Sequence, residues 1–368
     1  MWILVAVLTA QNPTSPAQTP SSSSNQNSSA QAAQEVQSPQ SQSSSGAPQQ
    51  QAPQNPPAAG TSSAAGAAQE GEAPQEQQGD VYIFKKEVDE VTLHATVVDE
   101  HNRLVTDLTK GDFTVFEDGK PQKIVSFRHE DVPVAMGIVI DNSGSMRDKR
   151  PKVNAAAINL VQASNPQDQV FVVNFNEEYF LDQDYTGSIP KLRDALERIE
   201  SRGGTALYDA TVASADHLKK SGVLEKKVLL VVTDGEDNAS RESLEEAVRR
   251  LEEQNGPTIY TIGLLDEERS KKARRALRQM AEDTGGEAFF PKSLDEVEVI
   301  TSQIAHDIRN QYTITYHPSR PQSAGGYRTV KVEAQAKGYK HLQVRTRSGY
   351  YAGENRNRAA LAAPGPER

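Results

Sequence analysis

The sequence predicts an α/β protein with a doubly wound, mostly parallel sheet (a Rossmann-like arrangement) beside a small β-sandwich. Continuous apolar runs at 134–140, 170–175 and 228–233 are typical of strands buried on both faces of a parallel sheet. Segments with apolar residues at helical spacing separate these runs, and such alternation indicates a doubly wound sheet. Sequence that alternates apolar and polar residues lies on both sides of this block, and it predicts half-buried strands.

The two flanks differ from the central block. In the first flank, 80–131, VTLHATVV alternates, and FTVFEDGKPQKIVSF predicts two strands joined by a tight turn at Asp118-Gly119. The second flank, 312–353, carries alternating runs at 312–316, 328–335 and 342–351. Neither flank has enough strands to form a sandwich comfortably by itself.

The economical interpretation is therefore one β-sandwich built from both flanks, with an α/β domain at 132–311 inserted between them. The alternative is that the flanking strands extend the edges of the α/β sheet. Within the α/β block, two further strands are expected at 258–265 and 287–290. Helices are expected up to 164 and at 190–202, 206–220, 241–254, 270–284 and about 295–310.

The two ends of the chain have a different composition. Residues 1–10, MWILVAVLTA, form an apolar run of the length of a signal-peptide core, which is too short to cross a bilayer. No Lys or Arg precedes it, so we interpret it as a signal-peptide remnant and expect an exported protein, periplasmic, at the cell surface or secreted. Residues 11–79 are rich in Gln, Ser, Pro and Ala and predict a disordered linker, and 354–368 predict a flexible tail. No later segment is apolar enough to predict a transmembrane helix.

Composition and missing motifs exclude several functions. The formal net charge is −10 and no basic stripe is present, which argues against nucleic-acid binding. The chain has no cysteine, so disulfides, thiol nucleophiles and cysteine-based zinc sites are excluded. No GxGxxG, P-loop or HExxH pattern occurs, and the seven histidines lie in no recognisable motif. A phosphatase of the haloacid dehalogenase type needs an acid two residues after its aspartate, where this chain has Ser143. We therefore expect that the protein is not an enzyme.

Three polar clusters follow expected strands or face their ends. They are DNSGS after the run 134–140, GGT at 203–205, and TDG after the run 228–233. Ligands of doubly wound sheets bind beyond the carboxyl ends of the strands, so we expect these clusters to meet there. The candidate ligands are Asp141, Ser143, Ser145, Thr205 and Asp234.

Carboxylate and hydroxyl oxygens without His or Cys suit a hard divalent cation. Mg²⁺ is expected first, with Mn²⁺ or Ca²⁺ as alternatives. Gly144 is expected to let the two serines converge, and Gly203 and Gly204 to let the Thr205 loop approach closely. Each cluster taken alone is also explained as a turn or a helix cap.

Two neighbouring features leave alternatives open. Asp209 either supports the metal from behind its ligands or places a charge at a helix N-terminus. The run 236–238 either influences partner choice or forms a solvated loop and helix cap.

The clusters DNSGSM, GGTALYDA and VVTDGEDN resemble the metal-ion-dependent adhesion site of von Willebrand factor type A domains. The resemblance covers about 132–311 and matches the Asp-x-Ser-x-Ser, Thr and Asp pattern at every ligand position. It implies that Ser143, Ser145 and Thr205 bind the metal directly or through water, and that Asp141 and Asp234 often act through water. It also implies that an Asp or Glu of a protein partner completes the metal's shell. The flanks, with DFTVFEDGKPQKIVSF, QYTITYHP and VRTRSGYYA, resemble a type A-related bacterial family common in acidobacteria.

Two functions from different classes are consistent with these features. The first is a divalent-metal-dependent module for adhesion or protein–protein interaction, which captures an acidic residue of a protein partner at the cell envelope or outside the cell. The alternative is a structural or assembly protein in which the metal only stabilises the fold and another face binds. Loss of partner binding in a metal chelator separates them, because only the first requires the metal for binding.

Overall fold

A computed structural model describes residues 89–198, 201–221, 224–265 and 270–353. The predicted leader at 1–10, the linker at 11–79 and the tail at 354–368 lie outside these ranges. The strands of the described part are β1 (Val91–Asp99), β2 (Phe113–Glu117), β3 (Lys120–Gln122), β4 (Ile124–Arg128), β5 (Val134–Asp141), β6 (Gln169–Phe175), β7 (Tyr179–Thr186), β8 (Lys226–Thr233), β9 (Thr258–Gly263), β10 (Ala288–Phe289), β11 (Tyr312–Tyr316), β12 (Gly326–Ala334), β13 (Leu342–Arg345) and β14 (Gly349–Ala352). The α-helices are α1 (Arg150–Ala163), α2 (Ile189–Glu197), α3 (Leu207–Ser221), α4 (Leu244–Leu251), α5 (Lys271–Asp283) and α6 (Glu296–Arg309), and the short 3-10 helices are η1 (Lys110–Asp112), η2 (Gly144–Met146) and η3 (Gln322–Ala324).

A six-stranded sheet forms the centre of the α/β block, in the order β10-β9-β8-β5-β6-β7. All neighbouring strands are parallel except β6 and β7. The first strand of the block, β5, lies between β8 and β6, so the strand order reverses there, and the crevice at such a reversal is where ligands of doubly wound sheets bind. The predicted fold class is therefore confirmed.

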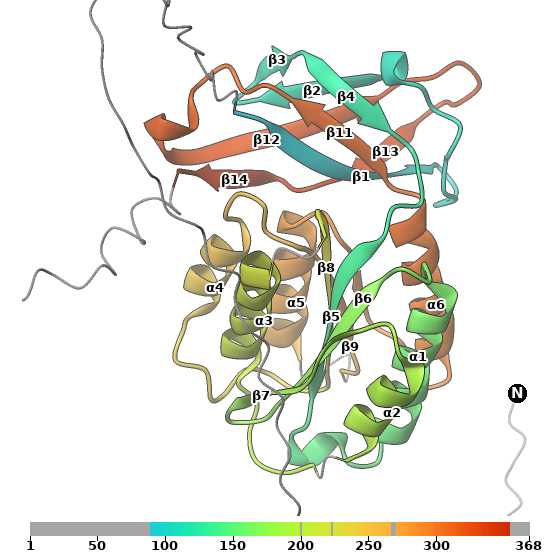
Figure 1. Cartoon of the computed structure of the whole chain (residues 1–368), viewed down its shortest axis with the longest axis vertical. Helices are drawn as coiled ribbons and strands as arrows, with labels where there is room; N and C mark the ends of the chain where they lie inside the picture. The colour runs from blue at the N-terminus through green and yellow to red at the C-terminus, as the bar shows by residue number, and fades with distance from the viewer. Residues whose placement is uncertain (1–88, 199–200, 222–223, 266–269, 354–368) are drawn as a thin grey trace, which may run out of the picture. The chain divides into compact units, whose positions relative to one another are not determined.

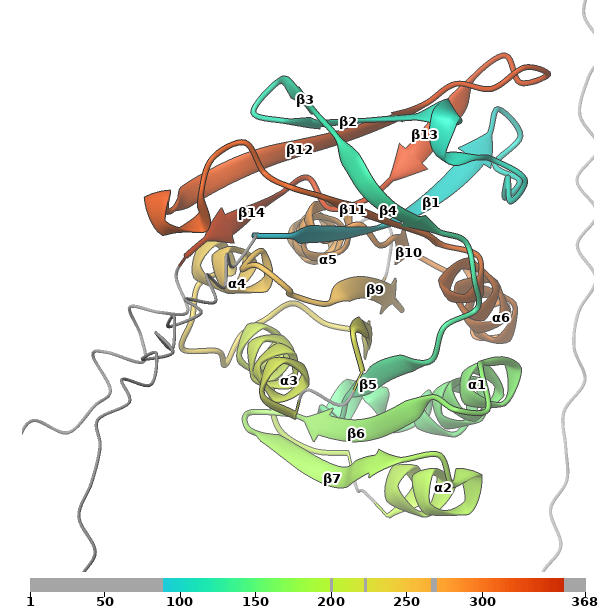
Figure 2. The same ribbon diagram turned by 45° about the horizontal axis from the view of Figure 1, so that its top comes forward.

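Helices cover both faces of this sheet (Figures 1 and 2). On one face, α1, α2 and α6 close an apolar core with residues such as Ile138, Leu160 and Ile304. On the other face, α3, α4 and α5 pack onto residues such as Val139 and Leu229. Successive residues of β5 point to opposite faces, and both faces are buried, which explains why its sequence is continuously apolar.

The antiparallel edge strand β7 is absent from the sequence-based prediction. Its sequence, YFLDQDYT, shows no alternation of buried and exposed positions, and Tyr179, Phe180 and Leu181 are each about half exposed. Hydrogen bonding to β6 holds the strand in place, because Phe175 pairs with Tyr179 and Asn174 with Phe180. Pairing at a sheet edge needs no buried face, so hydrophobic periodicity does not reveal this strand.

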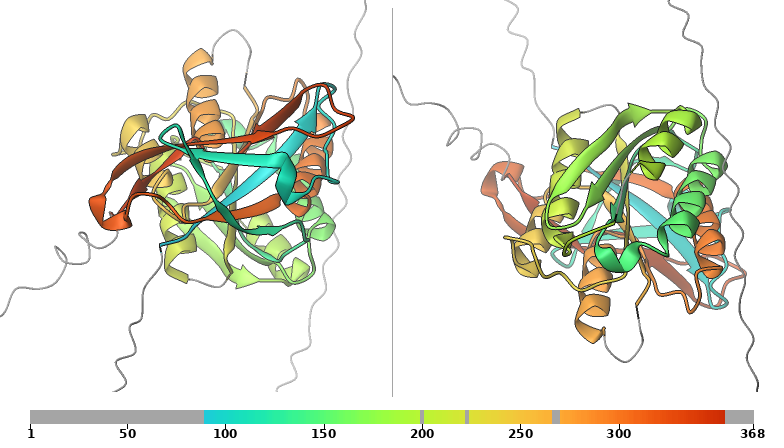
Figure 3. Two further views of the ribbon diagram at one scale, coloured as in Figure 1. Left: turned by 90° about the horizontal axis from the view of Figure 1, so that it is seen from above. Right: turned by 90° about the horizontal axis from the view of Figure 1, so that it is seen from below.

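The flanking segments form two antiparallel four-stranded sheets, in the orders β13-β1-β11-β4 and β14-β12-β2-β3. Each sheet combines strands from both flanks, and one shared core that includes Leu93, Val115, Ile314 and Tyr350 fills the space between them. The expected sandwich is thus present, and the alternative of strands added to the α/β sheet is wrong. Figure 3 (left) shows the two sheets from above. The limits proposed for the individual domains stay predictions.

The predicted hairpin is correct at its turn and wrong in its second strand. Asp118 and Gly119 both have positive φ, at 48° and 73°, and they join β2 to β3 by a two-residue turn of the kind expected for Asp-Gly. The segment that follows β3 does not continue in the same sheet. Instead, β4 pairs with β11 in the opposite sheet. One apparent strand in the sequence therefore bends across the sandwich.

Contacts between the sandwich and the α/β block lie at the amino ends of the parallel strands. Residues just before β9 and β10 form isolated bridges to the last segment of the sandwich, Glu253 to Tyr351 and Thr284 to Arg347. The side chain of Gln311 also donates to Tyr260 at 3.3 Å. The carboxyl ends of β5, β6 and β8 lie at the opposite edge, which Figure 3 (right) shows from below. Among the described helices, none is long and apolar enough to cross a membrane.

Candidate metal centre

The first predicted ligand, Asp141, is the last residue of β5 and is completely buried. Its Oδ1 accepts a hydrogen bond from the Ser143 backbone N–H at 2.7 Å, and its Oδ2 accepts one from Thr233 Oγ1 at 2.5 Å. Thr233 ends β8, the neighbouring strand, so the parallel register of β5 and β8 brings the two side chains together. Asp141 is therefore held rigidly behind the other candidate ligands.

Three of the candidate ligands form a continuous row of oxygens. Ser143 Oγ and Ser145 Oγ are 3.1 Å apart, and Ser145 Oγ donates to Asp234 Oδ1 at 2.7 Å. Ser143 and Ser145 stand at the start of η2 directly after β5, whereas Asp234 follows β8. The strand ends have thus brought together residues that are 89 positions apart, as the sequence predicted.

The fifth candidate, Thr205, lies in a loop that is held by Asn238. Asn238 Oδ1 accepts from the Thr205 N–H at 2.9 Å, and the Asn238 N–H donates to the Thr205 carbonyl at 3.0 Å. The Thr205 hydroxyl lies beside Gly235, where an added Cβ would come within 3.4 Å of it. Thr205 therefore faces the residue that follows Asp234.

The predicted role of the glycines is supported for one loop and wrong for the other. Gly203 has φ of +76°, and a Cβ on Gly204 would lie 2.7 Å from Asn238 Oδ1, so this loop needs both glycines. At Gly144 a Cβ would meet nothing within 4 Å, and its φ is not positive. The 3-10 turn of η2, and no special freedom of Gly144, brings the two serines together.

A cation from the protein already contacts the site. The Lys149 ammonium pairs with Asp234 Oδ2, on the side of the carboxylate away from Ser145. The Asp234 side chain is fully buried in this arrangement, and that of Lys149 is about one third exposed. Lys149 precedes α1 by one residue, so the helix start determines where this charge stands.

Burial raises the pKa of the Asp141 carboxyl, and the negative charge of Asp234 adds to this effect. The hydrogen bonds from Thr233 and Ser143 oppose the shift, because they stabilise the charged form. Two carboxylates that share a buried site repel each other. A bound divalent cation would remove this repulsion, which the Lys149 ammonium already compensates in part.

The row of oxygens has a spacing that a magnesium shell shares with ordinary hydrogen bonds between oxygens. In an octahedral shell with metal–oxygen bonds of about 2.0–2.1 Å, adjacent oxygens lie about 2.9 Å apart. The two oxygen–oxygen distances in the row, 3.1 Å and 2.7 Å, lie on either side of this value. Within the described ranges no group of three or more His, Cys, Asp or Glu side chains is placed to hold a metal, so any metal here depends on the hydroxyls. The donor set fits a hard cation.

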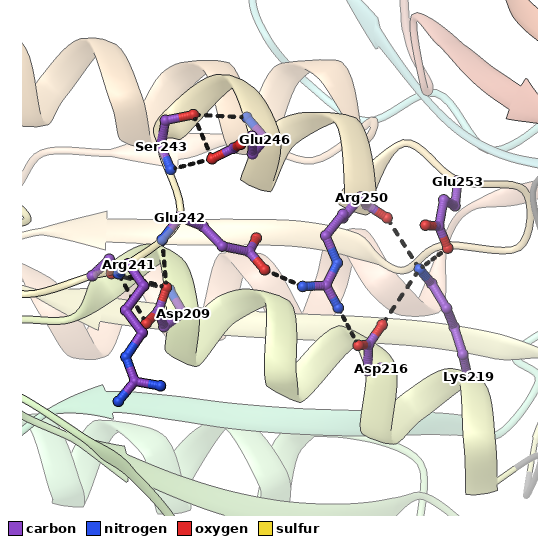
Figure 4. A network of polar contacts seen from close by, with 10 residues as sticks. Asp209, Asp216, Lys219, Arg241, Glu242, Ser243, Glu246, Arg250 and Glu253 are labelled. Atoms are coloured by element: carbon purple, nitrogen blue, oxygen red, sulfur yellow. Dashed lines mark hydrogen bonds and ion pairs between the residues drawn. The ribbon is translucent and has the colours of Figure 1, made fainter. Parts of the chain in front are cut away.

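Asp209 does not point to the metal site. Its carboxylate accepts from the backbone N–H groups of Arg241 and Glu242 at 3.1 Å, as Figure 4 shows. It therefore fastens the loop that follows Asp234 to the start of α3. The same figure shows Arg250 pairing with Asp216 and Glu242, which ties α4 to α3.

The run 236–238 is also occupied by structural contacts. Asp237 Oδ2 accepts from the Tyr208 N–H at 3.0 Å and from Ser240 Oγ at 2.5 Å. Together with the contacts of Asn238 to Thr205, these bonds shape the walls of the site. Sequence reasoning singled out Thr233 and Asn238 only as members of the cluster TDG and the run 236–238, without the supporting roles seen here, and it missed Lys149. For Thr233 a signal was present, since a hydroxyl directly precedes Asp234 at the end of a strand.

A doubly wound sheet with serine, threonine and aspartate side chains at its switch point defines a class of α/β domains. The sequence model of one family in this class, the von Willebrand factor type A domain, matches residues 136–303. The chain therefore contains a von Willebrand factor type A domain. No curated protein matches the chain in sequence. The resemblance of the flanks to the acidobacterial family stays a prediction.

Several solved structures are similar to parts of the chain. Proximal thread matrix protein 1 from the mussel byssus is 16% identical with a TM-score of 0.40, over 49% of this chain and 49% of its own. The chain thus spans about half the length of that protein. The vWF domain of the type V pili tip protein Mfa5 from Porphyromonas gingivalis is 14% identical with a TM-score of 0.41, over 48% of this chain and 95% of its own. A von Willebrand factor type A protein from Catenulispora acidiphila is 14% identical with a TM-score of 0.41, over 74% of this chain and 76% of its own.

Proposed function

We propose that this protein is a divalent-metal-dependent binding module that captures an acidic residue of a protein partner. The observation that carries the proposal is the row formed by Ser143, Ser145 and Asp234, whose oxygens have the spacing of a magnesium shell. In this proposal Asp141 and Thr205 complete the ligand set. Mg²⁺ is the expected metal, with Mn²⁺ or Ca²⁺ as alternatives.

The residues of the site have different tasks. Ser143, Ser145 and Thr205 offer neutral hydroxyls to the cation, so the metal keeps most of its positive charge. Asp141 is turned toward Thr233 and the Ser143 N–H, which hold it in position behind the serines. The bound metal supplies the electrophilic charge that an incoming Asp or Glu side chain would ligate. Ser145 is exposed, so a partner can approach the site from this side.

We propose a binding role without catalysis, because the oxygen donors of this row suit a hard cation and the sequence carries none of the nucleotide-binding or zinc-hydrolase motifs. We also propose that the protein acts outside the cytoplasm, at the cell envelope or secreted. The apolar segment 1–10 and the linker composition of 11–79 motivate this location. Fractionation of cells into cytoplasmic and exported pools tests it, and recovery of the full protein only in the cytoplasm would refute it.

The metal is tested by calorimetric titration of the full chain with Mg²⁺. Ser145→Ala is the informative variant, because Ser145 is exposed and its replacement leaves the fold intact. Ser302→Ala, at an exposed serine of α6, is the matched control. We expect Mg²⁺ binding to weaken at least tenfold in Ser145→Ala and to stay unchanged in Ser302→Ala. Equal binding by all three proteins would contradict the assigned ligands.

The role of the metal in partner binding is tested by capture from an envelope extract, in Mg²⁺ and in EDTA. We expect proteins that are retained by the wild type in Mg²⁺ and lost in EDTA or with Ser145→Ala. If Mg²⁺ raises the unfolding midpoint while the captured set stays the same in EDTA, the alternative function is correct. The metal would then only stabilise the fold, and another face would bind.

A further inference from the structure

A cavity rich in arginine lies beside the candidate metal centre. Its volume is about 840 Å³, and it opens between α1, α2 and the loop that leads to Thr205. Four arginines line it, Arg147, Arg150, Arg193 and Arg202, and Glu197 is the acidic residue among the lining side chains. We call these four residues with their cavity the arginine pocket. Its positive charge contrasts with the net charge of −10 of the whole chain.

Among the described residues, the arginines of this pocket have no carboxylate as an ion-pair partner. Arg147, Arg193 and Arg202 are exposed. Elsewhere arginines of this chain pair with acids, as Arg250 does with Asp216. Guanidinium groups that converge on a cavity without a carboxylate partner are suited to bind an anion.

Arg150 forms the buried part of the pocket and is only 5% exposed. Its Nη1 donates to Asn174 Oδ1 at 2.6 Å and its Nη2 donates to the Leu196 carbonyl at 3.0 Å, both neutral acceptors. Its Nε has no hydrogen-bond partner among the described residues. Burial lowers the pKa of Arg150 to about 10 and the negative charges of Asp182 and Asp141 oppose this shift, so the group stays charged at neutral pH. A buried cation with neutral partners gains from an anion nearby.

The arginine pocket and the metal centre share a wall. Arg147 follows Ser145 by two residues, and its Nη2 donates to the Ser201 carbonyl at 3.2 Å. The Arg202 N–H donates to the Asn142 carbonyl at 2.9 Å, next to Asp141 in the chain. The loops that carry the metal ligands are therefore the loops that carry three of the pocket's lining residues. The two sites are therefore neighbours on the surface formed by these loops.

We propose that the arginine pocket binds a second carboxylate of the partner that the metal centre captures, so that the module recognises an acidic segment. This inference rests on the proposed function. A guanidinium group binds carboxylates and phosphates through the same paired hydrogen bonds. Free phosphate is therefore the competing ligand for this pocket. A carboxylate is favoured because the adjoining metal centre, in the proposed function, takes one from the same protein partner.

The test uses the full chain and two labelled peptides. One peptide is hexaglutamate, and in the other all but one Glu is replaced by Gln. Arg193→Gln combined with Arg202→Gln removes two exposed charges of the pocket whose side chains make no hydrogen bond or ion pair within the described ranges. Lys272→Gln combined with Arg275→Gln, on α5 at the other face of the sheet, removes the same charge and is the matched control. Binding is measured by fluorescence anisotropy in Mg²⁺, in EDTA and with added inorganic phosphate.

In Mg²⁺ the wild type and the α5 control are expected to bind hexaglutamate about tenfold more tightly than the single-Glu peptide. The pocket variant is expected to lose this preference. If binding requires Mg²⁺ but the pocket variant keeps the preference, the inference is wrong and the proposed function stands. If the preference depends on the arginines but binding is equal in EDTA, the proposed function is wrong. Phosphate that abolishes the preference at concentrations where acetate does not would assign the pocket to phosphate and overturn the inference.

Discussion

Replacement of Thr233 by valine tests the buried support of the candidate metal centre. Thr233 is fully buried at the end of β8, and its hydroxyl donates to Asp141 Oδ2 at 2.5 Å. The same hydroxyl accepts from the Gly235 N–H at 3.2 Å. Valine has nearly the same shape, so the substitution removes these bonds with little change in packing volume.

The expected loss of stability follows from the charge of the acceptor. A hydrogen bond to a charged group contributes about 1.5–3 kcal/mol, against about 1 kcal/mol for a bond between neutral groups. Water cannot replace the lost donor, because Asp141 is completely buried. We therefore expect Thr233→Val to lower the free energy of unfolding by about 3 kcal/mol without metal. Thr211→Val is the matched control, since the buried Thr211 hydroxyl donates to the neutral Leu207 carbonyl at 2.8 Å and should cost about 1 kcal/mol.

The assay is urea unfolding of the full chain in EDTA, followed by circular dichroism. Thr233→Ser keeps the hydroxyl and should retain most of the stability. Loss of the donor raises the pKa of Asp141 further, so the difference between Thr233→Val and wild type should shrink at acid pH, where the carboxyl is protonated. The reasoning is refuted if Thr233→Val is no less stable than Thr211→Val at neutral pH, or if the deficit grows on acidification.

Three further substitutions test other charges. Lys149→Met removes the ammonium that competes with the metal for Asp234, so we expect the affinity for Mg²⁺ in calorimetry to rise roughly tenfold. An unchanged affinity would show that the ammonium does not oppose the metal. Glu117→Gln leaves the fully buried Arg328 without its counter-charge and should lower the free energy of unfolding by about 3–5 kcal/mol in urea, so a loss below about 1 kcal/mol would contradict this account. Burial raises the pKa of Asp168 from 3.8 to about 6, so the folded state holds a proton that the unfolded chain has released, and its contribution to stability falls as pH rises from about 4 to about 6. Relative to the wild type, the free energy of unfolding of Asp168→Asn should rise by up to about 3 kcal/mol over that pH range. If the stabilities of the two proteins change with pH in parallel, the pKa shift is refuted.

The sheet and the set of candidate ligands could be predicted because local sequence determines both. Strands buried on two faces must be apolar throughout, and this pattern alone identifies β5, β6 and β8. Parallel strands end at one edge of the sheet, so Asp141 and Asp234 are expected to meet although they are far apart in sequence. The structure places Ser143 and Ser145, which follow Asp141, in one row with Asp234.

Other features had no local signal. The strand β7 is held by edge pairing to β6 without a buried face, so its residues follow no pattern of hydrophobicity. The path of β4 into the opposite sheet depends on its partner β11, which is formed by residues at the far end of the chain. In the sequence, nothing distinguishes Lys149 from other polar residues that precede a helix. Its contact with Asp234 exists because the start of α1 lies against the end of β8.

The sequence by itself determined the kind of fold, the apolar faces and the candidate oxygen ligands, because these follow from burial and from the chemistry of single residues. The tertiary structure decided which neutral and charged groups surround those ligands. Thr233 and Asn238 hold the candidate ligands in place, Lys149 brings a competing charge, and the arginine pocket borders the site. Each of these depends on distances between separate strand ends and loops, which chain packing alone establishes.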